Sequence, residues 1–256
     1  MVRGYASVID RAAAHGEGSV RDGILRLTFH SDMIRYSACC VQPQAERMIH
    51  MNKKGQLIVI SGFSGAGKGT VVKELVGRYG YSLSISATTR APRPGEVDGK
   101  DYYFKTEAEF RNLIDYNGLI EWAQYVDNFY GTPRKFVEDE LAAGRDVILE
   151  IEVQGAAIIK EQYPDAMLLF ITTKDVATLR DRLMGRGSET EEQVKKRIRR
   201  AAEESEMIGN YDYIVINDDL DTCIETVHSV ILGGKCKRER NAEFIDQLQA
   251  DFRDEP

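Results

Sequence analysis

The residues best suited to chemistry form one glycine-rich segment, Gly62-Phe63-Ser64-Gly65-Ala66-Gly67-Lys68-Gly69-Thr70. The segment follows a short apolar run at 57–61 and opens a helical pattern over 69–78. Backbone N–H groups of such a loop can wrap a phosphate at a helix N-terminus, and glycine permits the close approach. Lys68 then reaches the outer phosphates as a compact charge. The spacing predicts a P-loop that binds a nucleoside triphosphate.

The residue after the lysine departs from the usual P-loop pattern. Gly69 stands where a serine or threonine is expected, so the sequence does not predict that a hydroxyl group at this position binds a metal ion directly. Thr70 offers a hydroxyl one residue later, as a donor or for a metal contact through water. The departure leaves the predicted phosphate binding unchanged.

Two arginines three residues apart form a second group of interest. Arg90 and Arg93 lie in a segment that is stiffened by Pro92 and Pro94. Guanidinium groups bind phosphate through two parallel hydrogen bonds, and prolines lower the entropy that is lost when such a clamp is ordered. Taken alone, the segment is equally compatible with a solvated charged loop.

Two carboxylates alternate at the end of an apolar run. Glu150 and Glu152 are two residues apart in the predicted strand 147–152, so both side chains are expected on one face. This arrangement suits a magnesium ion, bound through water, and an arginine or a ribose. A buried structural carboxylate is the alternative for either residue.

The composition is that of an ordinary soluble globular chain. Of the 256 residues, 43% are hydrophobic and 29% are charged, and the formal net charge is −7. This acidic balance argues against nucleic acid as the main partner, and no apolar run is long enough to cross a membrane. Residues 1–18 show no secretory signal. The four cysteines, Cys39, Cys40, Cys223 and Cys236, lack metal-site spacing, which favours reduced thiols and a cytoplasmic location.

From residue 55 onward, apolar runs alternate with helical patterns, which predicts a parallel sheet flanked by helices. The candidate strands are 57–61, 147–152, 167–172 and 213–217. The candidate helices are 69–78, 107–116, 133–143, 175–184, 191–208 and 220–232. Thr106 stands three residues before Glu109, and Thr190 three before Gln193, which is the spacing of a capping box at a helix N-terminus.

Three regions fall outside this alternation. The interval 82–132 holds short polar and aromatic segments, so we expect an insertion that carries substrate specificity. Residues 1–50 have no sustained period and are expected to be an extension, disordered or a mis-called start, because a regulatory arm has no motif to support it. The main domain is expected over 51–235, followed by a C-terminal helix over 236–256.

Several segments in register resemble the guanylate kinase family. They are GFSGAGKGT, SATTRAPRPGEVDGKDYYF, GLIEWAQY, NFYGTP, VILEIEVQGA, RLMGRGSETEEQVKKRI and YDYIVINDDL. The resemblance covers roughly residues 51–235 and implies a P-loop NTPase-type α/β fold, with an inserted GMP-binding subdomain at about 82–132 and a mobile lid at about 185–200. It also implies transfer of the γ-phosphoryl group of ATP to GMP, with Mg²⁺ accompanying ATP. It implies no nucleic-acid or membrane partner and leaves the oligomeric state open.

The resemblance assigns a role to each motif. The residues that bind ATP are Gly62, Phe63, Ser64, Gly65, Ala66, Gly67, Lys68, Gly69 and Thr70. The residues that bind GMP are Ser86, Arg90, Arg93, Tyr102, Glu121, Tyr130, Thr132 and Glu152. The catalytic residues are Lys68, Arg90, Arg182, Arg186 and Arg197, and Glu150 holds Mg²⁺ through water. Family members commonly have aspartate where this chain has Glu150 and Glu152.

Glu121 is the residue expected to select guanine. Guanine presents its N1–H and N2–H donors side by side, and one carboxylate can accept both. Adenine has an unprotonated N1 there, so its lone pair would face the carboxylate and the site would reject it. No general base is required, because a phosphate monoester is already largely dianionic at neutral pH.

Two other functions are weighed against this one. Guanylate-kinase-like modules of membrane scaffolds bind peptides without catalysis, but their P-loop is degraded, whereas Lys68 and the loop glycines are present here. A kinase of another nucleotide on the same fold is the second alternative. A phosphotransfer assay with GMP, AMP and dTMP as acceptors distinguishes the three possibilities.

Overall fold

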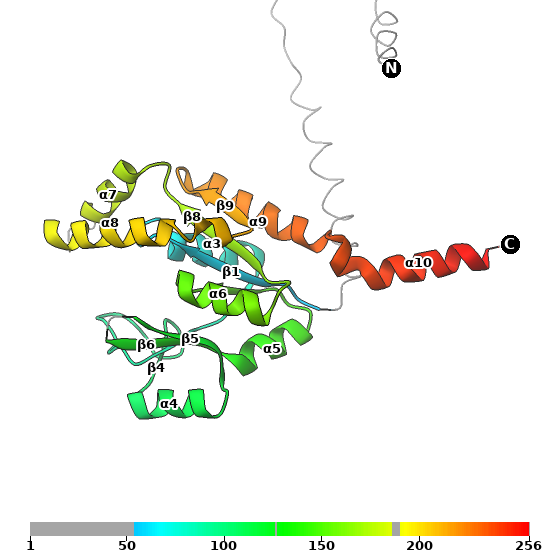
Figure 1. Cartoon of the computed structure of the whole chain (residues 1–256), viewed down its shortest axis with the longest axis horizontal. Helices are drawn as coiled ribbons and strands as arrows, with labels where there is room; N and C mark the ends of the chain where they lie inside the picture. The colour runs from blue at the N-terminus through cyan, green and yellow to red at the C-terminus, as the bar shows by residue number, and fades with distance from the viewer. Residues whose placement is uncertain (1–53, 126, 186–189, 256) are drawn as a thin grey trace, which may run out of the picture. The chain divides into compact units, whose positions relative to one another are not determined.

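Five parallel strands form the central sheet of the computed structural model, which describes residues 54–125, 127–185 and 190–255 (Figure 1). Across the sheet the strands are β2 (Ser82–Leu83), β7 (Val147–Glu150), β1 (Leu57–Gly62), β8 (Met167–Thr172) and β9 (Tyr213–Ile216). All neighbouring pairs are parallel. The carboxyl ends of the strands therefore meet at one edge, where open α/β sheets bind ligands. The expected extension over 1–50 lies outside the described residues.

Helices cover both faces of this sheet because its strands are apolar on both sides. All six residues of β1 are buried. Ile58 and Ile60 pack toward α3 (Lys68–Tyr79) and α9 (Leu220–Lys235). Leu57 and Val59 pack toward α5 (Arg134–Ala142) and α6 (Val153–Gln162) on the opposite face. This two-sided burial fixes β1, and hence the loop that follows it, in the centre of the fold.

A second, smaller sheet lies within residues 87–133. Its strands are β4 (Tyr103–Phe104), β3 (Ala87–Thr88), β6 (Asn128–Pro133) and β5 (Leu119–Tyr125), in this order. Helix α4 (Glu107–Asp115) packs on it through the fully buried Phe110. Figure 1 shows this small sheet and α4 on the side of the molecule where α5 and α6 lie. The insertion expected from the broken sequence rhythm thus has a small core of its own.

The remaining elements follow β8 and β9. Helices α7 (Val176–Met184) and α8 (Glu191–Ser205) pack on each other through Leu179, Leu183 and Val194. A 3₁₀ turn, η1 (Ile208–Asn210), leads into β9. After α9 the chain continues through η2 (Arg238–Asn241) into α10 (Ala242–Asp254). None of the helices in the described ranges is long and apolar enough to cross a membrane.

Most predicted elements are confirmed within three residues of their ends, and both capping boxes are present. Four details differ. The strand predicted over 147–152 ends at Glu150, and Glu152 is instead the N-cap of α6, a helix that the sequence did not indicate. The helix predicted to reach residue 208 ends at Ser205, because the chain then tightens into η1. The segments of β5 and β6, for which no strands were predicted, form a hairpin. In addition, the C-terminal helix expected over 236–256 begins only at Ala242, because η2 separates it from α9.

Candidate active site

The glycine loop between β1 and α3 has the backbone geometry of an anion cradle. Gly62, Gly65 and Gly67 have φ values of 148°, 98° and 94°, which side chains rarely adopt. No side chain caps the N-terminus of α3. Its first N–H groups, together with the positive end of the helix dipole, therefore face the loop and favour a bound phosphate.

Lys68 is folded over this loop. Its Nζ donates to the carbonyl oxygen of Gly62 at 2.6 Å and to that of Phe63 at 3.4 Å. The ammonium group is thus held at the mouth of the cradle by two carbonyl groups. A phosphate, with full negative charge, is a stronger acceptor than either carbonyl, so the lysine can exchange these partners for it.

Two residues from distant parts of the chain brace the loop from behind. Asn217, just after β9, donates through Nδ2 to the carbonyl of Ala66 at 2.8 Å. Arg182 of α7 donates to the same carbonyl at 3.3 Å and to the carbonyl of Asn217 at 2.8 Å. A Cβ atom added at Gly67 would lie 2.5 Å from Asn217 Nδ2, so the contact leaves no room for a side chain.

Helix α8 contacts the loop and the start of α6 through its arginines. Arg197 Nη1 donates to Ser64 Oγ at 2.7 Å. Arg200 pairs with Glu204 at 2.8 Å and lies 3.9 Å from Glu152. Arg186, the third arginine expected here, lies outside the described residues. The structure therefore brings both Arg182 and Arg197 into contact with the glycine loop.

Glu150 faces the start of α3 from the end of β7. A Cβ atom added at Gly69 would lie 3.6 Å from Glu150 Oε1, an ordinary contact. Burial raises the pKa of Glu150, the positive charge of Lys68 lowers it, and Glu152 raises it slightly. A partly desolvated carboxylate beside a lysine and a helix N-terminus suits a hydrated cation that arrives with phosphate groups.

Arg90 is fixed in the small sheet by a carboxylate and by aromatic rings. Its Nη2 lies 2.9 Å from Glu96 Oε1, and its guanidinium lies 5.3 Å from the ring centre of Tyr102. Glu96 raises the pKa of Arg90, and Arg90 lowers that of Glu96. Tyr130 is also close, because its ring centre lies 6.1 Å from that of Tyr102.

Two further predicted residues lie beside this cluster. The backbone N–H of Arg93 donates to Glu96 Oε2 at 2.7 Å, so one carboxylate holds both arginine positions. The Arg93 side chain is exposed. Ser86 is half-buried just before β3, and its carbonyl accepts from Tyr103 N at 2.9 Å. Burial raises the pKa of Tyr102, and the negative charge of Glu150 raises it further.

Glu121 and Thr132 face each other across the β5–β6 hairpin. Thr132 Oγ1 donates to Glu121 Oε1 at 2.5 Å, and the two side chains are buried. Burial raises the pKa of Glu121 from its ordinary 4.5 to about 7, although the hydrogen bonds from Thr132 pull it down. A Cβ atom added at Gly155 would lie 2.7 Å from Glu121 Oε2, so α6 approaches this carboxylate closely.

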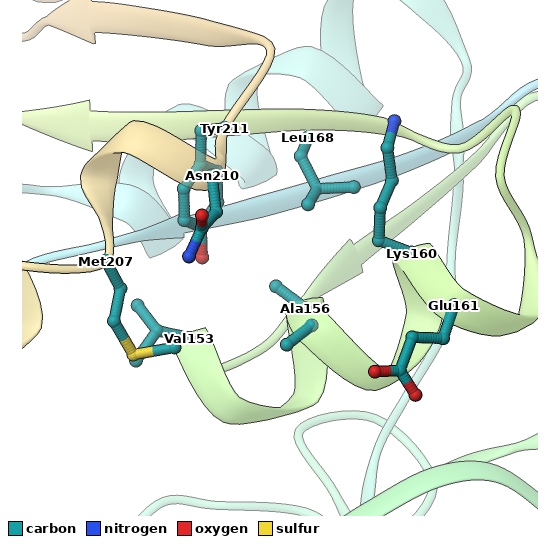
Figure 2. A pocket seen from close by; sticks show the side chains of 9 residues that line it. Val153, Ala156, Lys160, Glu161, Leu168, Met207, Asn210 and Tyr211 are labelled. Carbon is teal, nitrogen blue, oxygen red and sulfur yellow. The ribbon is translucent and has the colours of Figure 1, made fainter.

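Two hollows open on either side of α6. One, of about 370 Å³, is bordered by Glu121, Trp122 and Arg134. The other, of about 350 Å³, contains none of the predicted site residues. Figure 2 shows its lining: Val153 and Ala156 of α6 lie on one side, and Met207, Asn210 and Tyr211 lie on the other. Of the predicted site residues, Glu121 alone borders the first hollow, so neither hollow by itself outlines the predicted site.

Three contributors to this site were missed or misjudged from the sequence. Glu96 orders the arginine segment, and its one signal was its position three residues after Arg93. Asn217, at the end of the predicted strand 213–217, braces the P-loop, a role that was not predicted. Arg200 was given no role from the sequence, but it pairs with Glu204, which is buried with 6% of its surface exposed.

The sheet order, the glycine loop between β1 and α3 and the arginines around it define the class of P-loop phosphate-binding α/β proteins. Residues 54–233 match the family model described as guanylate kinase. The chain is 47% identical over 200 residues to guanylate kinase of Caldanaerobacter subterraneus subsp. tengcongensis, covering 78% of this chain and 97% of that protein. It is 48% identical over 203 residues to guanylate kinase of Lactiplantibacillus plantarum, covering 78% and 98%. The chain belongs to the guanylate kinase family.

A solved structure agrees with this assignment. The crystal structure of guanylate kinase from Anaplasma phagocytophilum has a TM-score of 0.63 to this chain at 32% sequence identity. The similarity covers 74% of this chain and 90% of that one. The resemblance inferred from the motifs is confirmed, and so is the mixed α/β fold with a parallel sheet between helices.

Proposed function

We propose that the protein is a guanylate kinase that transfers the γ-phosphoryl group of ATP to GMP and releases ADP and GDP. The observation that carries the proposal is the buried pair of Glu121 and Thr132 in a chain whose P-loop keeps its lysine and its glycines. A carboxylate kept from water accepts N1–H and N2–H of guanine and opposes the lone pair of adenine N1. Ser86 adds a third polar group to the base site.

On the donor side, residues 62–70 bind the phosphates of ATP. Lys68 leaves the carbonyl of Gly62 and follows the charge that moves toward the bridge between the β- and γ-phosphates. Its contact is stronger in the transition state than in the ground state, so it lowers the barrier rather than merely tightening binding.

On the acceptor side, Arg90 and Arg93 bind the phosphate of GMP, and the hydroxyl groups of Tyr102 and Tyr130 complete the cradle. The contact of Arg90 with Glu96, at 2.9 Å, supports this role, because an arginine that is already ordered loses less entropy when it binds. Glu152, at the N-cap of α6, serves the nucleotide side. We propose residues 82–132 as the GMP-binding subdomain of a main domain over 51–235.

Three arginines contact the phosphoryl group while it is transferred. Arg182, Arg186 and Arg197 stabilise its spreading charge, and the segment 185–200 acts as a mobile lid that excludes water. The contact of Arg197 with Ser64 at 2.7 Å supports the role of that residue. The phosphate of GMP is already largely dianionic at neutral pH, so no side chain has to remove a proton from it.

Mg²⁺ fits this site as a companion of ATP. Among the described residues no group of three or more His, Cys, Asp and Glu side chains could hold a metal ion. Mg²⁺ in kinases is typically bound by one or two carboxylates and the substrate phosphates, so Glu150 alone would suffice, through water. When bound, the ion offsets the negative charge of the phosphates. The free thiols of Cys223 and Cys236 are compatible with a cytoplasmic location.

The test is a coupled phosphotransfer assay with ATP and with GMP, AMP or dTMP as acceptor. We expect turnover with GMP, and at least about a thousandfold lower kcat/KM with AMP. Lys68→Ala is the matched control, because it should abolish turnover while GMP still binds. No turnover with any acceptor would instead favour a binding module, and comparable rates with AMP would favour a different nucleotide kinase.

A further inference from the structure

Helix α10 presents an apolar stripe to solvent. None of its 13 residues is buried. Phe244, Leu248 and Phe252 expose 41%, 40% and 72% of their surface. Figure 1 shows α10, in red, extending away from the central sheet and from the glycine loop after β1. The helix lies beyond residues 54–233, which match the family model, so the proposed catalysis does not explain it.

A helix of this length needs a partner to be stable. Isolated helices shorter than about 12–15 residues are marginal in water even when their sequence favours helix. The sequence of α10 is amphipathic, since Phe244, Ile245, Leu248 and Phe252 fall within an arc of about 100°. Such a stripe is normally covered, and this one extends over about 12 Å of helix.

The stripe is symmetrical along the helix. Phe244 precedes Leu248 by four residues, and Phe252 follows it by four. If two copies of α10 cross antiparallel at Leu248, each Phe244 meets the partner's Phe252, and the two Leu248 side chains meet each other. A surface that is complementary to itself in this way fits a two-fold dimer, in which the same patch is used by both subunits.

The charges near the two ends of α10 favour the antiparallel arrangement. Lys237 and Arg238, just before the helix, are exposed, although Arg238 also pairs with Glu239 at 3.0 Å. Asp251, Asp254 and Glu255, at its other end, are exposed as well. An antiparallel pair brings each acidic end toward the basic start of the other helix, whereas a parallel pair brings like charges together.

The same charges disfavour a membrane surface. Away from the stripe, α10 carries four carboxylates and one cation. The carboxylates belong to Glu243, Asp246, Asp251 and Asp254, and the cation is Arg253. Amphipathic helices that lie on anionic lipids are instead rich in lysine and arginine on their polar face.

We propose that α10 is a self-association surface through which two copies of this chain form an antiparallel, two-fold symmetric dimer centred on Leu248. The stripe alone is smaller than the roughly 800 Å² per partner of a stable interface. The dimer is therefore reversible, and its population depends on the protein concentration. The proposal does not depend on the proposed reaction.

Sedimentation velocity on the full chain tests this proposal. As the concentration rises from about 1 to about 100 μM, the wild type should shift from monomer toward dimer by mass action. Leu248→Glu should remain monomeric throughout, because it places two charges on the axis. Gln249→Glu adds the same charge beside the stripe and should still dimerise. Both variants should keep their melting temperature and phosphotransfer rate.

A cross-linking experiment tests the symmetry. Leu248→Cys should form a disulfide-linked dimer when diamide oxidises the two thiols, and Asp246→Cys, on the opposite face, should not. The wild type measured alongside accounts for the native cysteines. The proposal is overturned if Asp246→Cys cross-links as well as Leu248→Cys. It also fails if the wild type stays monomeric while Leu248→Glu lowers its melting temperature, because a segment of the same chain then covers the stripe.

Discussion

The buried carboxylate of Glu121 should make the use of GMP depend on pH. The N1–H and N2–H groups of guanine need the ionised carboxylate of Glu121 as their acceptor. Burial raises the pKa of Glu121 to about 7. With that pKa, about nine-tenths of the carboxyl groups are ionised at pH 8 and about one-tenth at pH 6. We therefore expect kcat/KM for GMP to fall about tenfold over this range because of Glu121 alone.

Glu121→Gln separates this effect from the titration of the substrate. The phosphate of GMP, with a second pKa of about 6, also gains a proton over this range, but it does so equally with either enzyme. In the variant, the pH profile of kcat/KM for GMP should lose the step near pH 7, which is due to Glu121, and keep the step near pH 6, which is due to the phosphate. At pH 8 its kcat/KM ratio for GMP over AMP should fall about 30- to 160-fold, for a loss of roughly 2–3 kcal/mol in a charged hydrogen bond.

The same substitution should stabilise the fold. A carboxyl group whose pKa is raised on folding binds a proton more tightly when folded, so its buried charge costs stability above that pKa. The rise from 4.5 to about 7 corresponds to roughly 3 kcal/mol at pH 8. Glu121→Gln should therefore melt higher than the wild type at pH 8, and this advantage should shrink toward pH 4.5. Identical pH profiles together with equal melting temperatures would refute this account of Glu121.

Three further predictions concern other contacts. Lys68→Ala should lower kcat at least about a hundredfold while GMP binding, measured by calorimetry, changes little, and activity within about threefold of wild type would contradict it. Glu96→Gln should raise KM for GMP about tenfold, because Arg90 loses its ionic partner at 2.9 Å, and an unchanged KM would show that Arg90 is held by other groups. Burial and Lys235 lower the pKa of His228, which lies 2.8 Å from Tyr81 Oη, so stability should be lost as pH falls below about 6.5. His228→Gln should lose less unfolding free energy than the wild type between pH 7.5 and 5.5 in urea titrations, and an equal loss would argue against this role.

The parts of the fold that the sequence predicted are those set by local pattern. β1 and β8 are continuous apolar runs, and α4 and α8 begin at capping boxes, so their residues alone indicate them. Helix α6 was not predicted, because Gly155 in its first turn weakens the helical signal. That glycine is required by tertiary packing, since a Cβ atom there would lie 2.7 Å from Glu121 Oε2.

In the candidate site too, the sequence predicted the residues marked by local pattern and missed those whose role depends on tertiary packing. The glycine loop and the arginine segment stand out because their residue types and spacing are unusual. Glu204 does not stand out, because a glutamate four residues after an arginine on a charged helix is normally a solvated ion pair. Only the packing of α8 shows that this carboxylate is buried beside Arg200 and close to Glu152.

The contact between Asn217 and the P-loop limits which substitutions the loop can accept during evolution. Gly67 is constrained twice, by its φ of 94° and by an amide nitrogen 2.5 Å from where a Cβ atom would lie. Any other residue at position 67 would meet both constraints, so we expect selection to remove nearly every substitution there. Gly69, two residues away, has neither constraint, and a Cβ atom there would lie a comfortable 3.6 Å from Glu150. Serine at position 69 would therefore meet no steric barrier, so the loop's departure from the common pattern is not imposed by packing.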